Sequence, residues 1–139
     1  MVISSAFAGV ALSDDSCAVM ERPKDFARKF VSIRATVTPT MHGTYLVAAG
    51  CAVSLIVVLP EEIPKYRGTV KTIKDGAFDQ FMRARYDFRP EREVLEATLK
   101  GQVETASPSR GFGYYHKNPA RLVLGSVESA TAGKRIGTH

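Results

Sequence analysis

Polar and apolar residues alternate along several stretches of the chain, and this period of two predicts β-strands. The clearest run is 30–38, in which β-branched residues recur and which Pro39 ends. Turn residues follow, and 44–48 predicts a second strand returning from that turn. The continuously apolar run 53–59 predicts a third strand that is buried on both faces.

A helical period replaces this alternation further along the chain. Asp75 is placed to cap a helix over 76–88, and Pro90 is placed to stop it. Side chains at helical spacing predict one stripe that packs into the core, formed by Phe78, Phe81, Met82, Arg85 and Tyr86. The preceding segment 65–74 is polar, and its pattern leaves open whether it is a loop or an extra strand.

Two more strands are predicted near the C-terminus, over 93–105 and 120–130, with a long turn-rich loop over 106–119 between them. In the first of these strands, one face is formed by Ala97, Leu99, Gly101 and Val103. Near the N-terminus, 23–29 predicts a turn or a helical turn that Phe26 anchors.

Three strands, a helix and two strands follow the order of the oligonucleotide/oligosaccharide-binding (OB) fold, a five-stranded Greek-key barrel. We therefore predict a mainly β protein, an OB-fold-like barrel with one helix in the order β-β-β-α-β-β. A generic α+β sandwich has the same order and stays open. The 139 residues suit one domain, predicted over 17–130, with a leader or disordered segment over 1–16 and a flexible tail over 131–139.

The two cysteines, Cys17 and Cys51, allow two interpretations, free thiols in a reducing compartment or a disulfide in an exported protein. The segment 2–12 is apolar and rich in small residues, and contains an A-x-A pattern at 6–8, as in the second half of a secretory signal. It lacks a basic region before it, and a short buried strand or helix is the alternative. We favour export, to the periplasm or beyond the cell, with a Cys17–Cys51 disulfide; a cytoplasmic protein is the alternative.

Two sets of motifs near the two ends of the chain carry a family resemblance. The N-terminal set consists of Cys17, Pro23, Phe26, the stretch Lys29-Phe30-Val31-Ser32-Ile33-Arg34-Ala35, Leu46 and Cys51. The C-terminal set consists of Gly111-Phe112-Gly113 and Pro119-Ala120-Arg121-Leu122-Val123-Leu124. Together they resemble a group of small exported OB-like bacterial proteins of unknown function. The resemblance implies the fold and export, and it implies no particular activity.

The sequence contains none of the common catalytic or cofactor motifs, and Gly111-Phe112-Gly113 is a lone G-x-G in a loop. His42, His116 and His139 lack the spacing of metal ligands. We therefore predict no enzyme activity, no metal and no cofactor. The net charge of +5 favours anionic ligands, although acidic residues are scattered among the basic ones.

The loops between the first and second strands and between the fourth and fifth strands form the rim of the binding surface in an OB barrel. Here they and their flanks carry aromatic side chains beside cations, which suit stacking on rings and contact with anionic groups. The candidate ligand-binding residues are His42, Tyr45, Arg110, Tyr114, Tyr115, His116 and Lys117, with Phe112 and Asn118 in the same loop. Alternatively, Phe112 and a tyrosine only close the barrel end.

We predict a monomeric, exported, non-enzymatic binding module whose ligand is a protein, a peptide, a glycan or a small anion. The alternative is an intracellular OB protein that binds single-stranded nucleic acid. The predicted fourth strand argues against this alternative, because Glu96 and Glu104 lie on the same face as Lys100 and would repel a phosphate backbone. No stretch of the sequence is long and apolar enough to predict a transmembrane helix.

Overall fold

The computed structural model describes residues 15–89, 93–106, 111–112 and 118–133. Five strands, two α-helices and two short 3-10 helices are found in these residues. In chain order they are α2 (Ser16–Glu21), η1 (Pro23–Phe26), β1 (Phe30–Thr40), β2 (Gly43–Val47), β3 (Leu55–Val58), η2 (Pro60–Glu62), α3 (Gly76–Arg85), β4 (Val94–Thr105) and β5 (Ala120–Gly133). The prediction of a mainly β protein with five strands and a helix between the third and fourth is confirmed.

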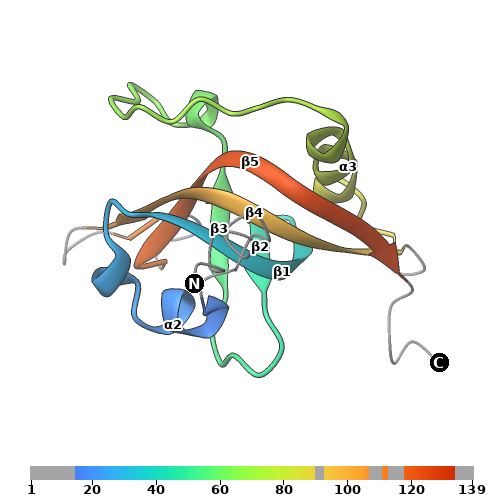
Figure 1. The fold of residues 1–139 in the computed structure, drawn as a ribbon, viewed down its shortest axis with the longest axis horizontal. Coiled ribbons are helices and arrows are strands. Elements are labelled where there is room, and N and C mark those ends of the chain that lie inside the picture. The colour runs from blue at the N-terminus through green and yellow to red at the C-terminus, as the bar shows by residue number, and fades with distance from the viewer. Residues whose placement is uncertain (1–14, 90–92, 107–110, 113–117, 134–139) are drawn as a thin grey trace, which may run out of the picture.

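The strands pair in a closed ring, in the order β1-β2-β3-β5-β4 (Figure 1). β3 and β5 run parallel, and every other pair in the ring is antiparallel. β1 is long enough to serve two neighbours, because it pairs with β4 over Phe30–Val37 and with β2 over Thr36–Thr40. Among the strands that the structure describes, none has an edge that is unpaired along its whole length.

Alternate residues of the five strands point into the ring and form the core. β1 contributes Val31, Ile33, Ala35 and Val37, and β4 and β5 together contribute Leu95, Ala97, Leu99, Val103, Ala120, Leu122, Leu124 and Val127. α2 adds Val19 and Met20, and α3 adds Phe78 and Phe81 from another side of the barrel (Figure 1). Leu55, Ile56 and Val57 of β3 are all buried, so the predicted burial of both faces of this strand is confirmed.

β1 continues through Pro39, where the sequence predicted its end. Pro39 pairs with Thr44 of β2, beyond the point where the pairing of β1 with β4 ends. No strand on the β4 side of β1 therefore needs the amide hydrogen that Pro39 lacks. β5 likewise continues through Gly133, beyond the predicted end at residue 130, because the start of β4 pairs with it. The remaining predicted tail, 134–139, lies outside the described residues.

α3 begins as predicted, with the Asp75 carboxylate accepting the Phe78 amide at 3.0 Å. It ends at Arg85, three residues earlier than the sequence predicted. Phe78 and Phe81 are buried and Met82 is half-buried, but Tyr86 is 62% exposed. The predicted stripe is therefore wrong at Tyr86, because the helix has ended before that residue could turn toward the barrel.

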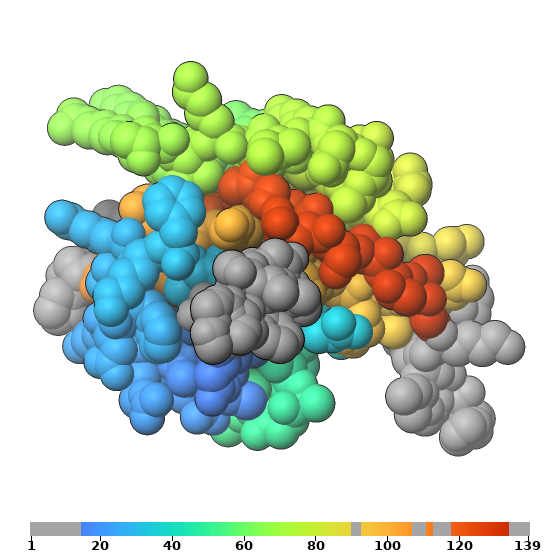
Figure 2. Space-filling view, in the orientation of Figure 1, coloured from blue at the N-terminus to red at the C-terminus, as the bar shows by residue number. Residues whose placement is uncertain are grey.

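The segment 65–74, which the sequence left open, contains no helix or strand in the structure and runs along the outside of β5 (Figure 2). The Ile73 amide donates to the Gly125 carbonyl at 2.8 Å, and the Thr72 hydroxyl donates to the Leu124 carbonyl at 2.8 Å. Val70 is buried beside Gly125. The segment thus shields the outward-facing Val123 of β5, which is fully buried.

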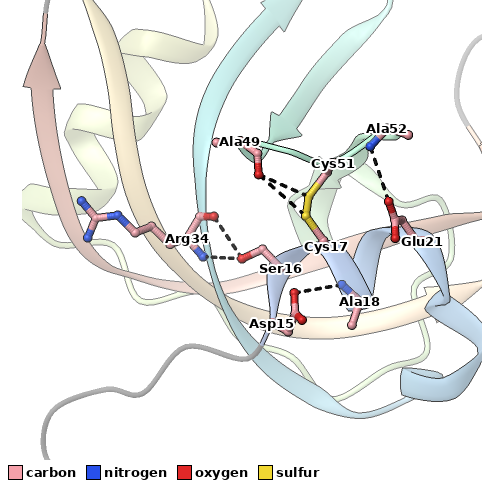
Figure 3. The surroundings of a disulfide bond; sticks show 9 residues. All are labelled: Asp15, Ser16, Cys17, Ala18, Glu21, Arg34, Ala49, Cys51 and Ala52. Atoms are coloured by element: carbon pink, nitrogen blue, oxygen red, sulfur yellow. Dashed lines mark hydrogen bonds between the residues drawn. A yellow bond between two sulfur atoms is a disulfide. The ribbon is translucent and has the colours of Figure 1, made fainter.

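α2 is a helix that the sequence analysis did not predict, and it is bonded to the barrel at several points (Figure 3). The predicted disulfide between Cys17 and Cys51 is present in the structure, with the two Cα atoms 5.2 Å apart, an ordinary separation for this bond. The Ser16 hydroxyl bonds to the backbone of Arg34 in β1, and Glu21 accepts the Ala52 amide at 3.5 Å. None of the helices in the described part of the chain combines the length and the apolar character that crossing a bilayer requires.

Candidate functional site

The long connection between β4 and β5 begins and ends as a continuation of the hairpin. The Ala106 amide donates to the Pro119 carbonyl at 2.8 Å, directly beyond the last strand pair. Farther out, Phe112 and Asn118 exchange two backbone hydrogen bonds of 2.7 and 2.9 Å, forming an isolated antiparallel bridge. These bonds fix the positions of Phe112 and Asn118 relative to the barrel.

The Asn118 side chain joins this loop to β2. Its Nδ2 donates to the Tyr45 hydroxyl oxygen at 3.2 Å and to the Phe112 carbonyl at 2.8 Å. Tyr45 lies on the outer face of β2, since its neighbours Thr44 and Leu46 are buried on the opposite face. Asn118, which lies 73 positions from Tyr45 in the sequence, thus holds the loop against β2.

Arg121, at the start of β5, holds the aromatic residue of the loop. Its guanidinium lies 4.1 Å from the centre of the Phe112 ring, a close cation–π contact. The same guanidinium forms an ion pair with Glu104 of β4 at 2.8 Å, and both side chains are largely shielded from solvent. The Glu104 carboxylate thereby fixes the plane of the guanidinium, and Phe112 packs against that plane.

Strand register explains why these residues meet. Tyr45 pairs with Ile56, Ile56 with Arg121, and Arg121 with Glu104, so the four occupy one row across β2, β3, β5 and β4. We call Tyr45, Glu104, Phe112, Asn118 and Arg121 the loop-base cluster. It combines a phenol, an amide and a guanidinium-stacked aromatic ring on the outer surface of the barrel.

The side chains of the loop-base cluster can form hydrogen bonds and stacking contacts. A phenol and an amide can donate and accept hydrogen bonds, and an aromatic ring beside a cation can pack against a planar or sugar-like group. The cluster contains no hydroxyl or thiol nucleophile activated by a neighbouring base. Across the described residues, His, Cys, Asp and Glu side chains do not gather in the groups of three or more that a metal site requires.

The structure describes two of the seven predicted ligand-binding residues. Tyr45 belongs to the loop-base cluster, whereas His42 is exposed in the turn between β1 and β2. That turn consists of Met41 and His42 alone, because Thr40 already pairs with Gly43. The other five predicted residues, Arg110, Tyr114, Tyr115, His116 and Lys117, lie outside the described residues.

The sequence analysis missed Glu104 and Arg121 as members of this cluster. A signal for them was present, because opposite charges at equal distances from the two ends of a hairpin loop fall opposite each other. Thr105 pairs with Ala120, so the next pair along the hairpin is Glu104 with Arg121.

Comparison of the chain with known protein families, curated proteins and solved structures finds no match.

Proposed function

We propose that this protein is an exported, monomeric OB-fold-like module that binds a ligand at the loop-base cluster and carries out no catalysis. The fold assignment is supported by the ring order β1-β2-β3-β5-β4 with α3 between β3 and β4, which is the arrangement expected of an OB barrel. In such barrels the face of the second and third strands and the loop between the fourth and fifth strands contact ligands.

The observation that carries the proposal is the pair of hydrogen bonds from Asn118 to Tyr45 and Phe112. They bring a loop residue, an aromatic ring and the outer face of β2 to one surface. Because Arg121 and Glu104 hold the Phe112 ring in advance, little side-chain freedom is lost when a ligand packs there. Arg110, Tyr114, Tyr115, His116 and Lys117 belong to the same loop and complete the proposed binding surface.

Export is proposed from two independent features. A disulfide joins α2 to the segment after β2, and such bonds are typical of proteins in oxidising compartments such as the periplasm or the outside of the cell. The apolar, small-residue pattern of 2–12 is typical of a secretory signal. The ligand classes we propose there are a protein or peptide, a glycan, and a small anion, since the chain has a net charge of +5.

Nucleic acid is the less favoured ligand. Glu96 of β4 bonds to Thr36 of β1, and Glu104 neutralises Arg121. Carboxylates therefore lie on the outer surface along which a phosphate backbone would have to run.

The test is a binding screen of the oxidised protein against acidic and neutral oligosaccharides, peptides and fluorescein-labelled oligo-dT. Phe112→Ala should weaken binding of any ligand found by about tenfold, as expected for one lost stacking contact. Phe88→Ala removes an equally large aromatic ring that is 55% exposed elsewhere and should leave the affinity unchanged. The double variant Tyr115→Ala with Lys117→Ala tests the predicted loop residues in the same assay.

Two outcomes would change the proposal. Equal affinities of the Phe112→Ala variant and the unmodified protein would exclude the loop-base cluster as the binding surface. Tight oligo-dT binding with a steep salt dependence would favour the nucleic-acid alternative.

A further inference from the structure

A surface pocket of about 520 Å³ opens beside the loop-base cluster, on the outer side of β4. Its size falls within the range of small-molecule sites, roughly 300–1,000 Å³. Three segments line it: the corner before β1, the loop at 67–69 and the end of β4. These segments lie at the same end of the molecule in Figures 1 and 2. The residues on which the inference depends are Arg28, Arg67, Thr69, Gln102, Glu104 and Phe112.

Arg28 enters the pocket from an unusual backbone conformation. Its φ is 66°, in the left-handed region that glycine adopts most easily. Two hydrogen bonds hold it there: the Arg28 amide donates to the Val103 carbonyl at 2.7 Å, and Gln102 Nε2 donates to the Arg28 carbonyl at 3.0 Å. Glycine would adopt this φ with less strain. The chain nevertheless has an arginine at this corner, and strained backbone of this kind often occurs at functional sites.

Arg67 reaches the pocket from a loop that is folded around a tyrosine. The Tyr66 hydroxyl oxygen accepts the Val70 amide at 3.1 Å and closes the loop. Gly68 lies so close to the Tyr66 ring that a Cβ atom at this position would collide with it. The loop backbone therefore has little freedom, and Arg67 lines the pocket from a restrained part of the chain.

The pocket has an excess of positive charge. Among the described residues, neither Arg28 nor Arg67 has a carboxylate partner, whereas Glu104 is paired with Arg121. Thr69 and Gln102 add polar side chains to the lining, and Phe112 adds an aromatic one. Two guanidinium groups from segments 39 positions apart, beside an aromatic ring, suit an anionic group attached to a ring-shaped body.

We propose that this pocket binds the phosphate or carboxylate group of a sugar-sized small molecule. Arg28 and Arg67 contact the oxygen atoms of the anion, and Phe112 contacts the body of the molecule. This inference rests on the proposed function, because Phe112 and Glu104 belong to both the pocket and the loop-base cluster.

The first experiment titrates the oxidised, isotope-labelled full chain with inorganic phosphate and follows the amide signals by NMR. We expect saturable shifts at 27–29, 67–69 and 102–105, with a Kd on the order of 1 mM. Glucose 6-phosphate should bind more tightly than inorganic phosphate because its ring also contacts Phe112. Glucuronate in a third titration separates the two anions, since whichever sugar derivative binds more tightly identifies the preferred group.

The variants test whether the two arginines are responsible. Arg28→Gly removes the side chain and keeps the left-handed backbone, so it should fold and weaken phosphate binding by about tenfold. Arg67→Ala should have a similar effect. Arg83→Ala is the matched control, because it removes one exposed positive charge from α3, outside the pocket.

A loss of affinity in Arg28→Gly and Arg67→Ala but not in Arg83→Ala supports the proposal. Equal losses of affinity in all three variants would indicate general charge attraction and would overturn the proposal. Chemical shifts that do not saturate, or that occur outside the pocket, would also overturn it. Inorganic phosphate separates this inference from the proposed function, because it has no ring that could pack on Phe112. Phosphate binding that depends on Arg28 and Arg67 supports the pocket even where Phe112→Ala leaves the affinity for a ligand of the binding screen unchanged.

Discussion

The hydroxyl of Ser16 donates to the Arg34 carbonyl and accepts the Arg34 amide, each at 3.1 Å. β2 pairs with β1 only from Thr36 onward, so the backbone of Arg34 has no strand partner on that edge. A single side chain from α2 thus provides the two bonds that a neighbouring strand would otherwise make. This contact, together with the disulfide, determines where α2 covers the barrel.

Substitution of Ser16 by alanine should therefore destabilise the protein by about 1–3 kcal/mol, since it leaves a strand amide and carbonyl without their partner. Urea unfolding followed by circular dichroism measures this difference. Ser54→Ala is the control, because Ser54 is exposed in the connection between β2 and β3 and should change stability by less than about 0.5 kcal/mol. Similar midpoints for the two variants would contradict the structural role of Ser16.

Reduction of the Cys17–Cys51 disulfide should lower the free energy of unfolding by roughly 3 to 4 kcal/mol. The bond closes a loop across a sequence separation of 34 residues and restricts the unfolded chain accordingly. Urea unfolding with and without reductant measures the loss. A variant with both Cys17→Ser and Cys51→Ser should unfold at one midpoint under both conditions. If reductant shifts that midpoint as well, the loss has another cause.

Gly101 and Gly76 should respond in opposite directions to substitution by alanine. A Cβ atom at Gly101 would collide with the Val123 carbonyl and approach the Leu122 side chain to 3.1 Å, so Gly101→Ala should destabilise by about 1–3 kcal/mol. At Gly76, in the first turn of α3, a Cβ atom meets nothing within 4 Å. Gly76→Ala should therefore stabilise by about 0.5–1 kcal/mol. Thermal unfolding of the two variants measures both effects, and a destabilised Gly76→Ala would show that the site is more crowded than the structure indicates.

Glu61 should contribute a small, pH-dependent increment to stability. The hydrogen bond from Lys74, at 2.8 Å, is the largest of the effects that lower the pKa of the Glu61 carboxyl below its ordinary value of 4.5. A lowered pKa means that the contribution is present above pH 4.5 and is lost as the pH falls through the folded-state pKa. Because both side chains are about half exposed, the contribution is below about 1 kcal/mol.

The measurement compares the unmodified protein with Glu61→Gln across this pH range. Their difference in free energy of unfolding should be largest near neutral pH and should disappear in acid. In a Lys74→Met background, Glu61→Gln should have little effect at any pH. A difference that persists at low pH, or in that background, would assign the effect to something other than this ion pair.

Local patterns predicted most of the secondary structure. Alternation identified four of the strands and a continuously apolar run identified the third, all to within a few residues. Side chains on a strand point to opposite faces in turn, so the pattern shows which faces are buried. The Asp75 cap and the buried pair Phe78 and Phe81 were likewise readable from the sequence. The exposure of Tyr86 was not, because it depends on where the helix ends relative to the barrel surface.

α2 shows the limit of this approach. Its six residues are too few for a helical period to be recognised, and their helical form depends on burial of Val19 and Met20 against the barrel. The disulfide was one of two interpretations of Cys17 and Cys51. The structure favours it because Glu21 of α2 accepts the amide of Ala52, the residue after Cys51, while Ser16 bonds α2 to Arg34 of β1.

Sequence patterns were sufficient to predict the number and order of the strands, the helix between the third and fourth of them, and the aromatic and basic character of the connection after the fourth. Three features depended on the tertiary structure: the closure of the ring through the parallel pair β3 and β5, the row that joins Tyr45 to Glu104, and the placement of Arg28 and Arg67 on one pocket. The periodicity of polar and apolar positions is a property of one short segment, so it can be recognised in the sequence. Pairing between distant strands depends instead on which strand edges and faces the rest of the fold leaves open.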